Sequence, residues 1–248
     1  MTTAHAQLAR TQPEWQVPAD QPIIVTIDGP AGTGKSTVAK TLAERLGLDF
    51  LDTGAMYRAA TAISIDHKID PDDVDNLLKV VESADLHFDW ATDPPAILAW
   101  LKPIDKRIRD IDVTDLVSRI ATIGPLRQHM VRKQRIIASQ HPRLVTEGRD
   151  QGSIVFPDAE VKFYLDASPE IRARRRADQF RAQGRIVDDR QILANILGRD
   201  KMDAQRTDGP LICPEDAIVI DSSDLEVPEV VAAMETIVRK RVSTLRDG

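Results

Sequence analysis

A short glycine-rich segment, GPAGTGKS at residues 29–36, constrains the fold of this 248-residue chain more than any other feature. It matches the pattern G-x-x-x-x-G-K-[ST], in which glycines let the backbone wrap a polyphosphate with its N–H groups pointing inward. A β-branched run, Ile23–Ile27, precedes the segment, and a helical apolar pattern over Lys35–Leu46 follows it and ends at Gly47. Strand, glycine-rich loop and helix in this order predict a phosphate-binding loop (P-loop) within an α/β sheet.

The P-loop predicts a bound nucleoside triphosphate with Mg²⁺. Lys35 supplies a cation for the β- and γ-phosphates, Ser36 supplies a hydroxyl ligand for Mg²⁺, and the following helix presents its positive N-terminal end. A glycine-rich turn with an exposed lysine is the structural alternative, but such a turn does not require the flanking strand and helix. The residues expected to contact the triphosphate are Gly29, Pro30, Ala31, Gly32, Thr33, Gly34, Lys35, Ser36 and Thr37.

Four more short apolar runs alternate with helical patterns along the rest of the chain. Strands separated by helices predict right-handed crossovers, and hence a three-layer α/β fold with a five-stranded parallel sheet and helices on both faces. The further strands are expected at residues 50–51, 144–146, 161–165 and 217–220, and the further helices at residues 53–67, 71–84, 113–139 (interrupted near 124–125), 168–206 and 228–245. Thr53 is expected to cap the first of these helices, and Ser168 the fourth.

Two segments depart from this alternation. Residues 1–21 contain Pro13 and Pro18 and show no periodicity, which predicts a flexible N-terminal extension, although Trp15 can dock on the surface. Residues 86–109 contain short strand-like runs on either side of a proline turn, which predicts small antiparallel strands inserted into the fold. Residues 22–248 are then expected to form one domain.

The amino-acid composition limits which partners, metal sites and cellular location are expected for this domain. The chain carries 33 Lys and Arg against 39 Asp and Glu, and this acidic balance argues against general nucleic-acid binding. Its single cysteine, Cys213, excludes an intramolecular disulfide and a cysteine-rich zinc site. No apolar run is long enough for a membrane span, and the first residues lack the pattern of a secretory signal. We therefore expect a cytoplasmic protein that binds neither nucleic acid nor membrane.

Three classes of P-loop protein compete for this sequence: GTPase switches, ATPases and small-molecule kinases. A GTPase reads guanine with an Asn-Lys-x-Asp segment, and neither Asn76 nor Asn195 precedes a lysine. The strand ending at Glu147 suits an ATPase, but the residues Gly-Arg-Asp follow it, and an arginine there suits phosphate binding better than water activation. Residues 170–206 carry ten Lys and Arg against six Asp and Glu, as expected for a lid over a transferring phosphoryl group. The kinase class is therefore favoured.

Four further segments carry a more specific signal than the P-loop. They are LDTGAMYR at residues 51–58, EGRDQGS at 147–153, VFPDA at 155–159 and RDKMDAQR at 199–206. With these segments in this order, the chain resembles the bacterial cytidylate kinases, nucleoside monophosphate kinases of the P-loop class, from about Pro22 to its C-terminus. The resemblance implies a monophosphate-binding region at about residues 53–122, with the antiparallel insert inside it, and a mobile arginine-rich lid at about residues 172–190.

The resemblance also implies roles for single residues. Thr53, Arg127 and Asp150 match positions that face the cytosine, whose donor and acceptor groups their side chains complement. Guanidinium groups suit phosphate oxygens, and the positions that hold the monophosphate are matched by Arg58, Arg149 and Arg206. Ser118, Arg199 and Asp203 match positions near the ribose, Tyr57 is expected to pack beside the nucleotide, and the lid is expected to contain Arg172, Arg175 and Arg176. The expected catalytic residues are Lys35, Arg58, Arg149, Arg175 and Arg206.

The chain departs from the family pattern at several positions. Thr53 adds a methyl group where serine is common, and Glu147 adds a methylene where aspartate is common, which moves its contact with the water shell of Mg²⁺. Met202 and Ala204 replace residues that are often charged, which thins the positive field around the acceptor. Residues 92–107 match poorly, so the resemblance implies little about the contacts of the insert.

The function implied by the resemblance is transfer of the γ-phosphoryl group of ATP to CMP or dCMP, giving ADP and CDP or dCDP. The family also implies a monomer. Within the kinases the alternatives are a broader UMP/CMP enzyme, because the methyl group of Thr53 can change base tolerance, and a kinase for another small acceptor. From another class, a regulatory P-loop ATPase hydrolyses ATP without an acceptor.

Overall fold

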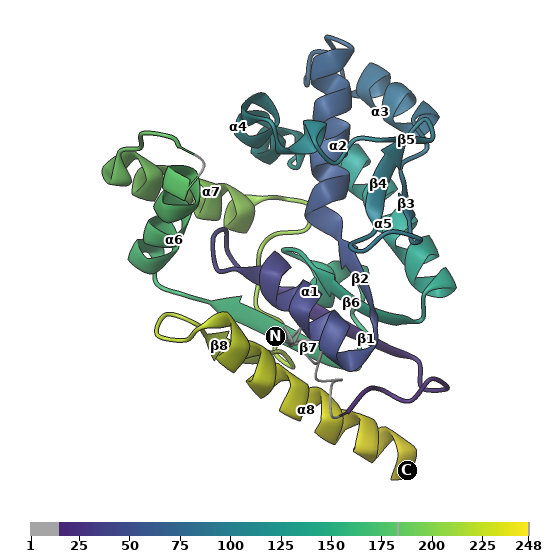
Figure 1. The fold of residues 1–248 in the computed structure, drawn as a ribbon. Helices are drawn as coiled ribbons and strands as arrows, with labels where there is room; N and C mark the ends of the chain where they lie inside the picture. Colours follow the sequence, from purple (N-terminus) through teal and green to yellow (C-terminus); the bar gives the residue numbers. More distant parts are fainter. Residues whose placement is uncertain (1–14, 183, 248) are drawn as a thin grey trace, which may run out of the picture.

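A parallel β-sheet of five strands forms the centre of the molecule (Figure 1). In the computed structural model, which describes residues 15–182 and 184–247, the strands follow the order β2–β6–β1–β7–β8. Each hydrogen-bonded pair of these strands is parallel, as the alternation of strands and helices predicts. The strands are β1 (Ile23–Asp28), β2 (Asp49–Asp52), β6 (Arg143–Glu147), β7 (Val161–Asp166) and β8 (Ile218–Asp221). The expected five-stranded parallel sheet is confirmed.

Helices cover both faces of this sheet. On one face α1 (Lys35–Leu46) and α8 (Val227–Asp247) lie side by side (Figure 1) and share an apolar core with β1 and β7. On the opposite face, a second apolar core joins α2 (Thr53–Asp66) and α5 (Gly124–Gln140) to β2 and β6. The central strands β1, β6 and β7 are buried on both faces and contain the continuous apolar runs that predict them, whereas Ile218 and Val219 of the edge strand β8 are exposed.

The chain between β2 and β6 forms a separate lobe beyond the carboxyl ends of the strands, at the top of Figure 1. This lobe contains α2, α5 and a three-stranded antiparallel sheet of order β3–β4–β5, which confirms the antiparallel insert expected at residues 86–109. Its other elements are α3 (Val74–Ser83), β3 (His87–Asp89), β4 (Ala96–Ala99), β5 (Lys102–Pro103), η1 (Arg107–Arg109) and α4 (Ile111–Ile120).

The start of α2 differs from the sequence prediction. Asp52 caps the helix, because its carboxylate accepts a hydrogen bond of 2.9 Å from the N–H of Ala55. Thr53 is the first residue of the helix, and its hydroxyl donates instead to the carbonyl of Glu147 at 2.7 Å. An Asp-Thr pair offers two capping side chains, and the strand that lies beside them decides which one is used. The prediction that Thr53 caps α2 is therefore wrong.

The arginine-rich segment folds into two helices with a turn between them. The first, α6 (Pro169–Ala182), begins as predicted with the hydroxyl of Ser168 accepting a backbone N–H of its first turn. The second, α7 (Asp189–Gln205), packs along α6, and the pair projects to one side of the sheet (Figure 1). Gly184, at φ +75°, lies in the turn. The lid expected at residues 172–190 spans most of α6, this turn and the start of α7, and its mobility stays a prediction. A short helical turn, η2 (Gln151–Val155), completes the described elements.

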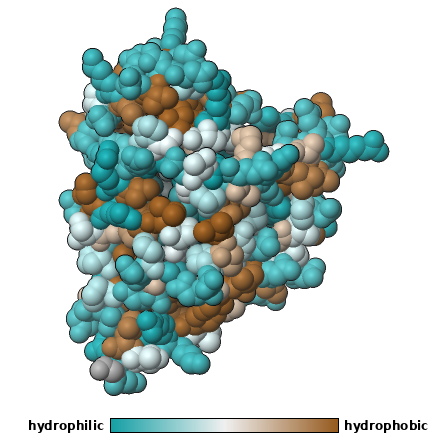
Figure 2. Space-filling view, turned by 180° about the vertical axis from the view of Figure 1, so that it is seen from behind, coloured by the Kyte–Doolittle hydropathy of each residue, from teal (hydrophilic) through white to brown (hydrophobic). Residues whose placement is uncertain are grey.

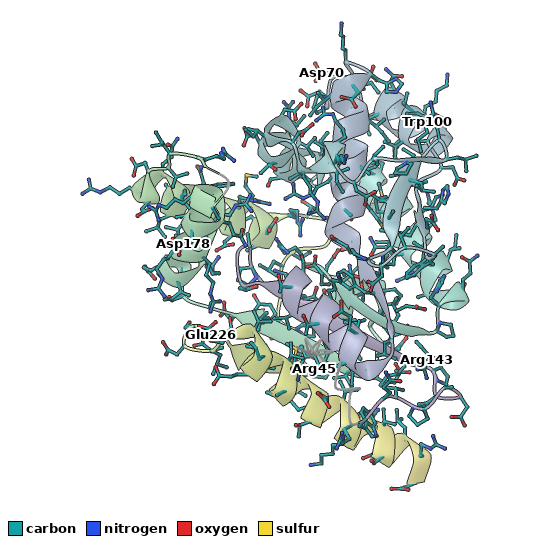
Figure 3. All side chains as sticks on the ribbon, in the orientation of Figure 1. Arg45, Asp70, Trp100, Arg143, Asp178 and Glu226 are labelled. Atoms are coloured by element: carbon teal, nitrogen blue, oxygen red, sulfur yellow. The ribbon has the colours of Figure 1, made fainter. Side chains whose placement is uncertain are left out.

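The chain just before β1 packs against the core. Val17 is buried, and its N–H donates to the last carbonyl of α1 at 2.9 Å. Arg143, labelled in Figure 3, donates to the carbonyls of Val17 and Pro18, and Trp15 joins the core shared by α1 and α8. Of the flexible extension expected over residues 1–21, the part up to residue 14 lies outside the described residues, whereas residues 15–21 dock on the surface.

On the face of the molecule opposite to the view of Figure 1, the apolar side chains left on the surface do not form one continuous patch. Seen from behind, they appear as separate brown patches divided by hydrophilic areas (Figure 2). Within residues 15–182 and 184–247, none of the helices has the length and apolar character needed to cross a bilayer.

The turn between β4 and β5 is strained. Trp100 and Leu101 adopt left-handed conformations, at φ +49° and +62°, with 42% and 77% of their surface exposed (Figure 3 labels Trp100). Two-residue turns of this kind favour Asn-Gly, because a side chain costs roughly 1–2 kcal/mol in this conformation. We expect Leu101→Gly to raise the free energy of unfolding by about 1 kcal/mol in a urea titration. The matched change in a helix, Leu197→Gly, should lower it, and a lower value for Leu101→Gly contradicts the strain.

Candidate active site

A cavity of about 310 Å³ opens at the carboxyl ends of β1, β2 and β6. The P-loop and the start of α1 form one wall, and the start of α2 with the loop after β6 forms another. Side chains from α4, α5, α6 and α7 enclose the remainder. Ligands of parallel α/β sheets bind at this edge, where loops and helix N-termini converge.

The P-loop residues divide into two groups. Ala31, Gly32, Gly34, Lys35, Ser36 and Thr37 line the cavity, whereas Gly29, Pro30 and Thr33 support the loop from outside it. Gly32 and Gly34 adopt φ +85° and +92°, a region that favours glycine. A Cβ on Gly29 would overlap the carbonyl of Leu165 on β7, so glycine lets the loop leave β1 in close contact with the sheet. The local sequence therefore produces a curled loop with one open side.

Lys35 lies at the wall of the cavity with only 5% of its surface exposed. Its amine donates to the carbonyl of Pro30 at 2.6 Å. Burial, together with the nearby Arg149 guanidinium, lowers the pKa of Lys35 to about 7. A phosphate group in the cavity favours the charged amine, so binding of a polyphosphate would protonate Lys35 and supply a cation beside the phosphates.

Three oxygen-bearing side chains, from Ser36, Asp52 and Glu147, meet at the floor of the cavity. The Ser36 hydroxyl donates to Glu147 at 2.8 Å, and Asp52 pairs with Glu147 across neighbouring strands. Burial and the charge of Glu147 raise the pKa of Asp52 to about 7. A hydroxyl and two crowded carboxylates are hard oxygen donors whose repulsion a cation relieves, so these residues fit Mg²⁺. Sequence reasoning gives Asp52 no role, because an aspartate before a helix indicates only a cap.

Arg127 and Asp150 form a buried ion pair in the same cavity, with side chains 4% and 5% exposed. Arg127 also donates to the carbonyl of Ala121 at 3.0 Å, and its guanidinium lies 5.3 Å from the centroid of the Tyr57 ring. Thr53 lines the cavity with them. The structure therefore brings together the three residues predicted to face the base, beside an aromatic ring.

Three arginines, Arg149, Arg199 and Arg206, surround a single aspartate, Asp203, on the cavity wall. Arg149 donates to Asp203 at 2.9 Å, and Arg206 lies 3.5 Å from the other oxygen of this carboxylate. The Nε and Nη2 atoms of Arg206 and the Nε atom of Arg199 are buried but have no hydrogen-bond partner in the part of the chain that the structure describes. Arg58 also lines the cavity and donates to a threonine hydroxyl of α4 at 3.1 Å.

Burial, with repulsion among the arginines added to it, lowers the pKa values of Arg58, Arg199 and Arg206. Burial and the charge of Arg149 lower the pKa of Arg199 to about 10. Burial also lowers the pKa of Arg206, with Arg127 adding to the effect, and lowers the pKa of Arg58. Crowded cations with buried N–H groups that lack acceptors form a binding site for a multivalent anion. Because a guanidinium binds phosphate oxygens with two parallel N–H groups, a phosphate monoester suits this site.

The lid arginines separate according to the face of α6 on which they lie. Arg176 lines the cavity. Arg172 is buried behind the P-loop, where it donates to the carbonyl of Ala31 at 3.0 Å and to Asp200 at 2.6 Å. Arg175 lies outside the cavity and donates to the carbonyl of Ser222 at 2.6 Å. The structure therefore does not bring Arg175 to the predicted catalytic group, because adjacent helical residues point about 100° apart.

The other residues predicted to bind the acceptor all line the cavity: Thr53, Tyr57, Arg58, Ser118, Arg127, Arg149, Asp150, Arg199, Asp203 and Arg206. They come from five segments that lie far apart in the sequence. Lys35 and Ser36 line the same cavity, so the P-loop and the anion site formed by the arginines share one cavity.

Comparison with known proteins gives a consistent result. The sequence model described as cytidylate kinase matches residues 25–240 of this chain. A protein of Corynebacterium efficiens named cytidylate kinase is 44% identical over 213 residues, which cover 85% of this chain and 92% of that protein. Proteins with the same name from Mycobacterium avium and Methylococcus capsulatus are 40% and 41% identical, over 90% and 87% of this chain and 98% and 96% of their own lengths.

The matched region contains the P-loop, the acid cluster of the cavity floor and the converging arginines. Both the family model and the relatives cover far more than half of the chain. The chain therefore belongs to the cytidylate kinase family of phosphoryl-transferring enzymes.

Proposed function

We propose that this protein transfers the γ-phosphoryl group of ATP to CMP or dCMP, giving ADP and CDP or dCDP. One observation carries the proposal: a single cavity joins the P-loop to buried arginine N–H groups that lack acceptors and to the Arg127–Asp150 pair. A donor with three phosphates and an acceptor with one satisfy these two groups of cations. The relatives named cytidylate kinase support the choice of base.

Base selection follows from the chemistry of Thr53, Arg127 and Asp150. The cytosine amino group is a donor and suits the Asp150 carboxylate, while N3 and the carbonyl of the base are acceptors and suit Arg127. Uracil presents a donor at N3 and an acceptor at position 4, so the same pair meets it with mismatched groups. Unpaired polar groups in a buried site weaken binding strongly, which favours CMP over UMP.

The reaction requires positioning and charge neutralisation rather than a general base, because the phosphate oxygen of CMP is already an anion near neutral pH. Lys35 holds the donor phosphates, and Arg58, Arg149 and Arg206 hold the acceptor phosphate. Ser36 and the acids beside it would hold Mg²⁺, which would neutralise charge on the donor phosphates. Asp203 and Arg199 orient the ribose. Arg176 of the lid neutralises the transferring group, and closure of the lid excludes water that would hydrolyse ATP.

The test is an ADP-release assay with MgATP and no acceptor, and then with CMP, dCMP, UMP, AMP, GMP or dTMP. We expect fast turnover with CMP and dCMP, slow turnover with UMP and little ADP without an acceptor. Equal rates with UMP and CMP would assign a broader pyrimidine kinase, and rapid acceptor-independent hydrolysis would assign an ATPase. We also propose that the enzyme acts in the cytoplasm, as its composition suggests, and as a monomer, as the family resemblance implies.

Proton uptake accompanies binding of the donor nucleotide. Because the pKa of Lys35 is about 7, its amine is mostly neutral at pH 8 in the free protein, and donor phosphates convert it to the charged form. We expect ADP without Mg²⁺ to bind at pH 8 with uptake of about one proton, measured by calorimetry in two buffers of different ionisation enthalpy. The uptake should decline as pH falls below 7, and Lys35→Met should abolish it. The same uptake in Lys35→Met contradicts the assignment to this amine.

A further inference from the structure

A buried carboxylate at the end of β1, Asp28, makes contacts that neither the P-loop motif nor the acceptor residues explain. It is 1% exposed and immediately precedes the P-loop. Its two oxygens accept hydrogen bonds from the N–H groups of Gln151, at 2.9 Å, and Gly152, at 2.7 Å. Burial raises the pKa of Asp28 to about 6, and the two N–H groups oppose that shift by stabilising the ionised form.

The other end of the same loop is also attached to β1. The N–H of Gly148 donates to the carbonyl of Ile27 at 3.1 Å. Residues 148–152 are therefore tied at both ends to the last two residues of the strand that leads into the P-loop. Between these attachments lie Arg149 and Asp150, which we assign to the acceptor phosphate and base.

The close approach of the loop to Asp28 depends on a glycine. A Cβ on Gly152 would lie 2.9 Å from the hydroxyl of Thr26 and 3.4 Å from Asp28, so the loop can approach β1 only without a side chain there. Contacts with the end of β1 therefore fix the position of this loop.

We propose that Asp28 is a positioning residue that fixes Arg149 and Asp150, and with them the acceptor, relative to the P-loop. The proposal rests on the assignment of Arg149 and Asp150 under the proposed function. Its mechanism is geometric: phosphoryl transfer requires donor and acceptor in line, and small displacements of a holding group reduce the rate strongly. Asp28 gives both substrate sites one shared support.

The test is Asp28→Asn, which keeps the shape but turns an amide N–H₂ toward one of the two backbone donors. We expect the KM for CMP to rise at least about tenfold and kcat to fall, because charged hydrogen bonds to the loop are lost. The KM for ATP should change less than about twofold, since backbone groups of the P-loop still hold the phosphates. The matched control is Thr26→Val on the same strand, whose buried hydroxyl has no partner within residues 15–182 and 184–247. In this control, kcat and the KM values for CMP and ATP should equal those of the wild type.

Equal rises in both KM values, or no change in either, would overturn the proposal. Amide hydrogen exchange provides a second readout that needs no substrate: the N–H groups of Gln151 and Gly152 should exchange slowly in the nucleotide-free wild-type protein. Fast exchange there overturns the attachment even if Asp28→Asn fails to fold. If these N–H groups exchange slowly but the protein does not phosphorylate CMP, the attachment of the loop to Asp28 is supported and only the proposed function is wrong.

Discussion

Lys35→Ala lowers kcat by about 10³-fold or more while the fold stays intact. Under the proposed function the amine is the P-loop cation for the donor phosphates, and it acts from a buried position where an ionic interaction is stronger than in water. Because burial already disfavours the charged amine, as its lowered pKa shows, its removal does not deprive the core of a stabilising charge. We therefore expect the thermal midpoint to stay within a few degrees of the wild-type value.

The control for this substitution is Lys40→Ala, which changes a lysine of the same helix whose side chain is 37% exposed. It should leave kcat unchanged. Steady-state kinetics and a thermal melt on all three proteins check the prediction. A Lys35→Ala enzyme with kcat within tenfold of wild type would show that the P-loop does not bind the reacting triphosphate.

Arg206→Gln raises the KM for CMP by about 100-fold and leaves the KM for ATP nearly unchanged. The guanidinium is buried, its Nε and Nη2 atoms have no protein acceptor among the described residues, and the proposed function assigns the acceptor phosphate as their partner. Loss of a buried charged hydrogen-bonding group costs roughly 2–5 kcal/mol in binding, which is the size of this effect. Burial and the charge of Arg127 lower the pKa of Arg206 more than Asp203 and Asp150 raise it, so removal of this cation should leave the thermal midpoint unchanged or raise it.

Affinity and stability therefore move in opposite directions for Arg206→Gln, which a general loss of folding cannot produce. The matched control is Arg190→Gln, at an exposed position of α7. It should change neither KM. If Arg206→Gln binds CMP normally, the anion site is not the acceptor site.

The sequence predicted the parts of this structure that depend on local patterns. The buried strands contain continuous apolar runs, and the P-loop matches a motif whose geometry is set by its own glycines, so the sheet and the loop could be predicted. Most acceptor residues could be placed only through the family resemblance, because a serine such as Ser118 or an arginine such as Arg127 carries no local signal of its role.

The errors arose where tertiary contacts decide between neighbours. Thr53 does not cap α2 because its hydroxyl reaches the carbonyl of Glu147 on the adjacent strand. Arg175 and Arg176 are equivalent in the sequence, and only the packing of α6 on the P-loop determines which one enters the cavity. Asp28 is one residue from a recognised motif, yet its partners are more than 120 residues away.

The lobe formed by the chain between β2 and β6 has a place in the sequence that affects how such enzymes diverge. β2 and β6 are hydrogen-bonded neighbours, yet the whole lobe lies between them in the sequence and joins the sheet only once at each end. Arg58, Ser118 and Arg127 belong to this insertion, whereas Lys35 and Ser36 belong to the sheet and its first loop. Substitutions at these three acceptor positions can therefore accumulate in one continuous stretch of gene that is separate from the P-loop, whereas the acceptor residues Arg149, Asp150 and Arg206 follow β6 and lie outside that stretch.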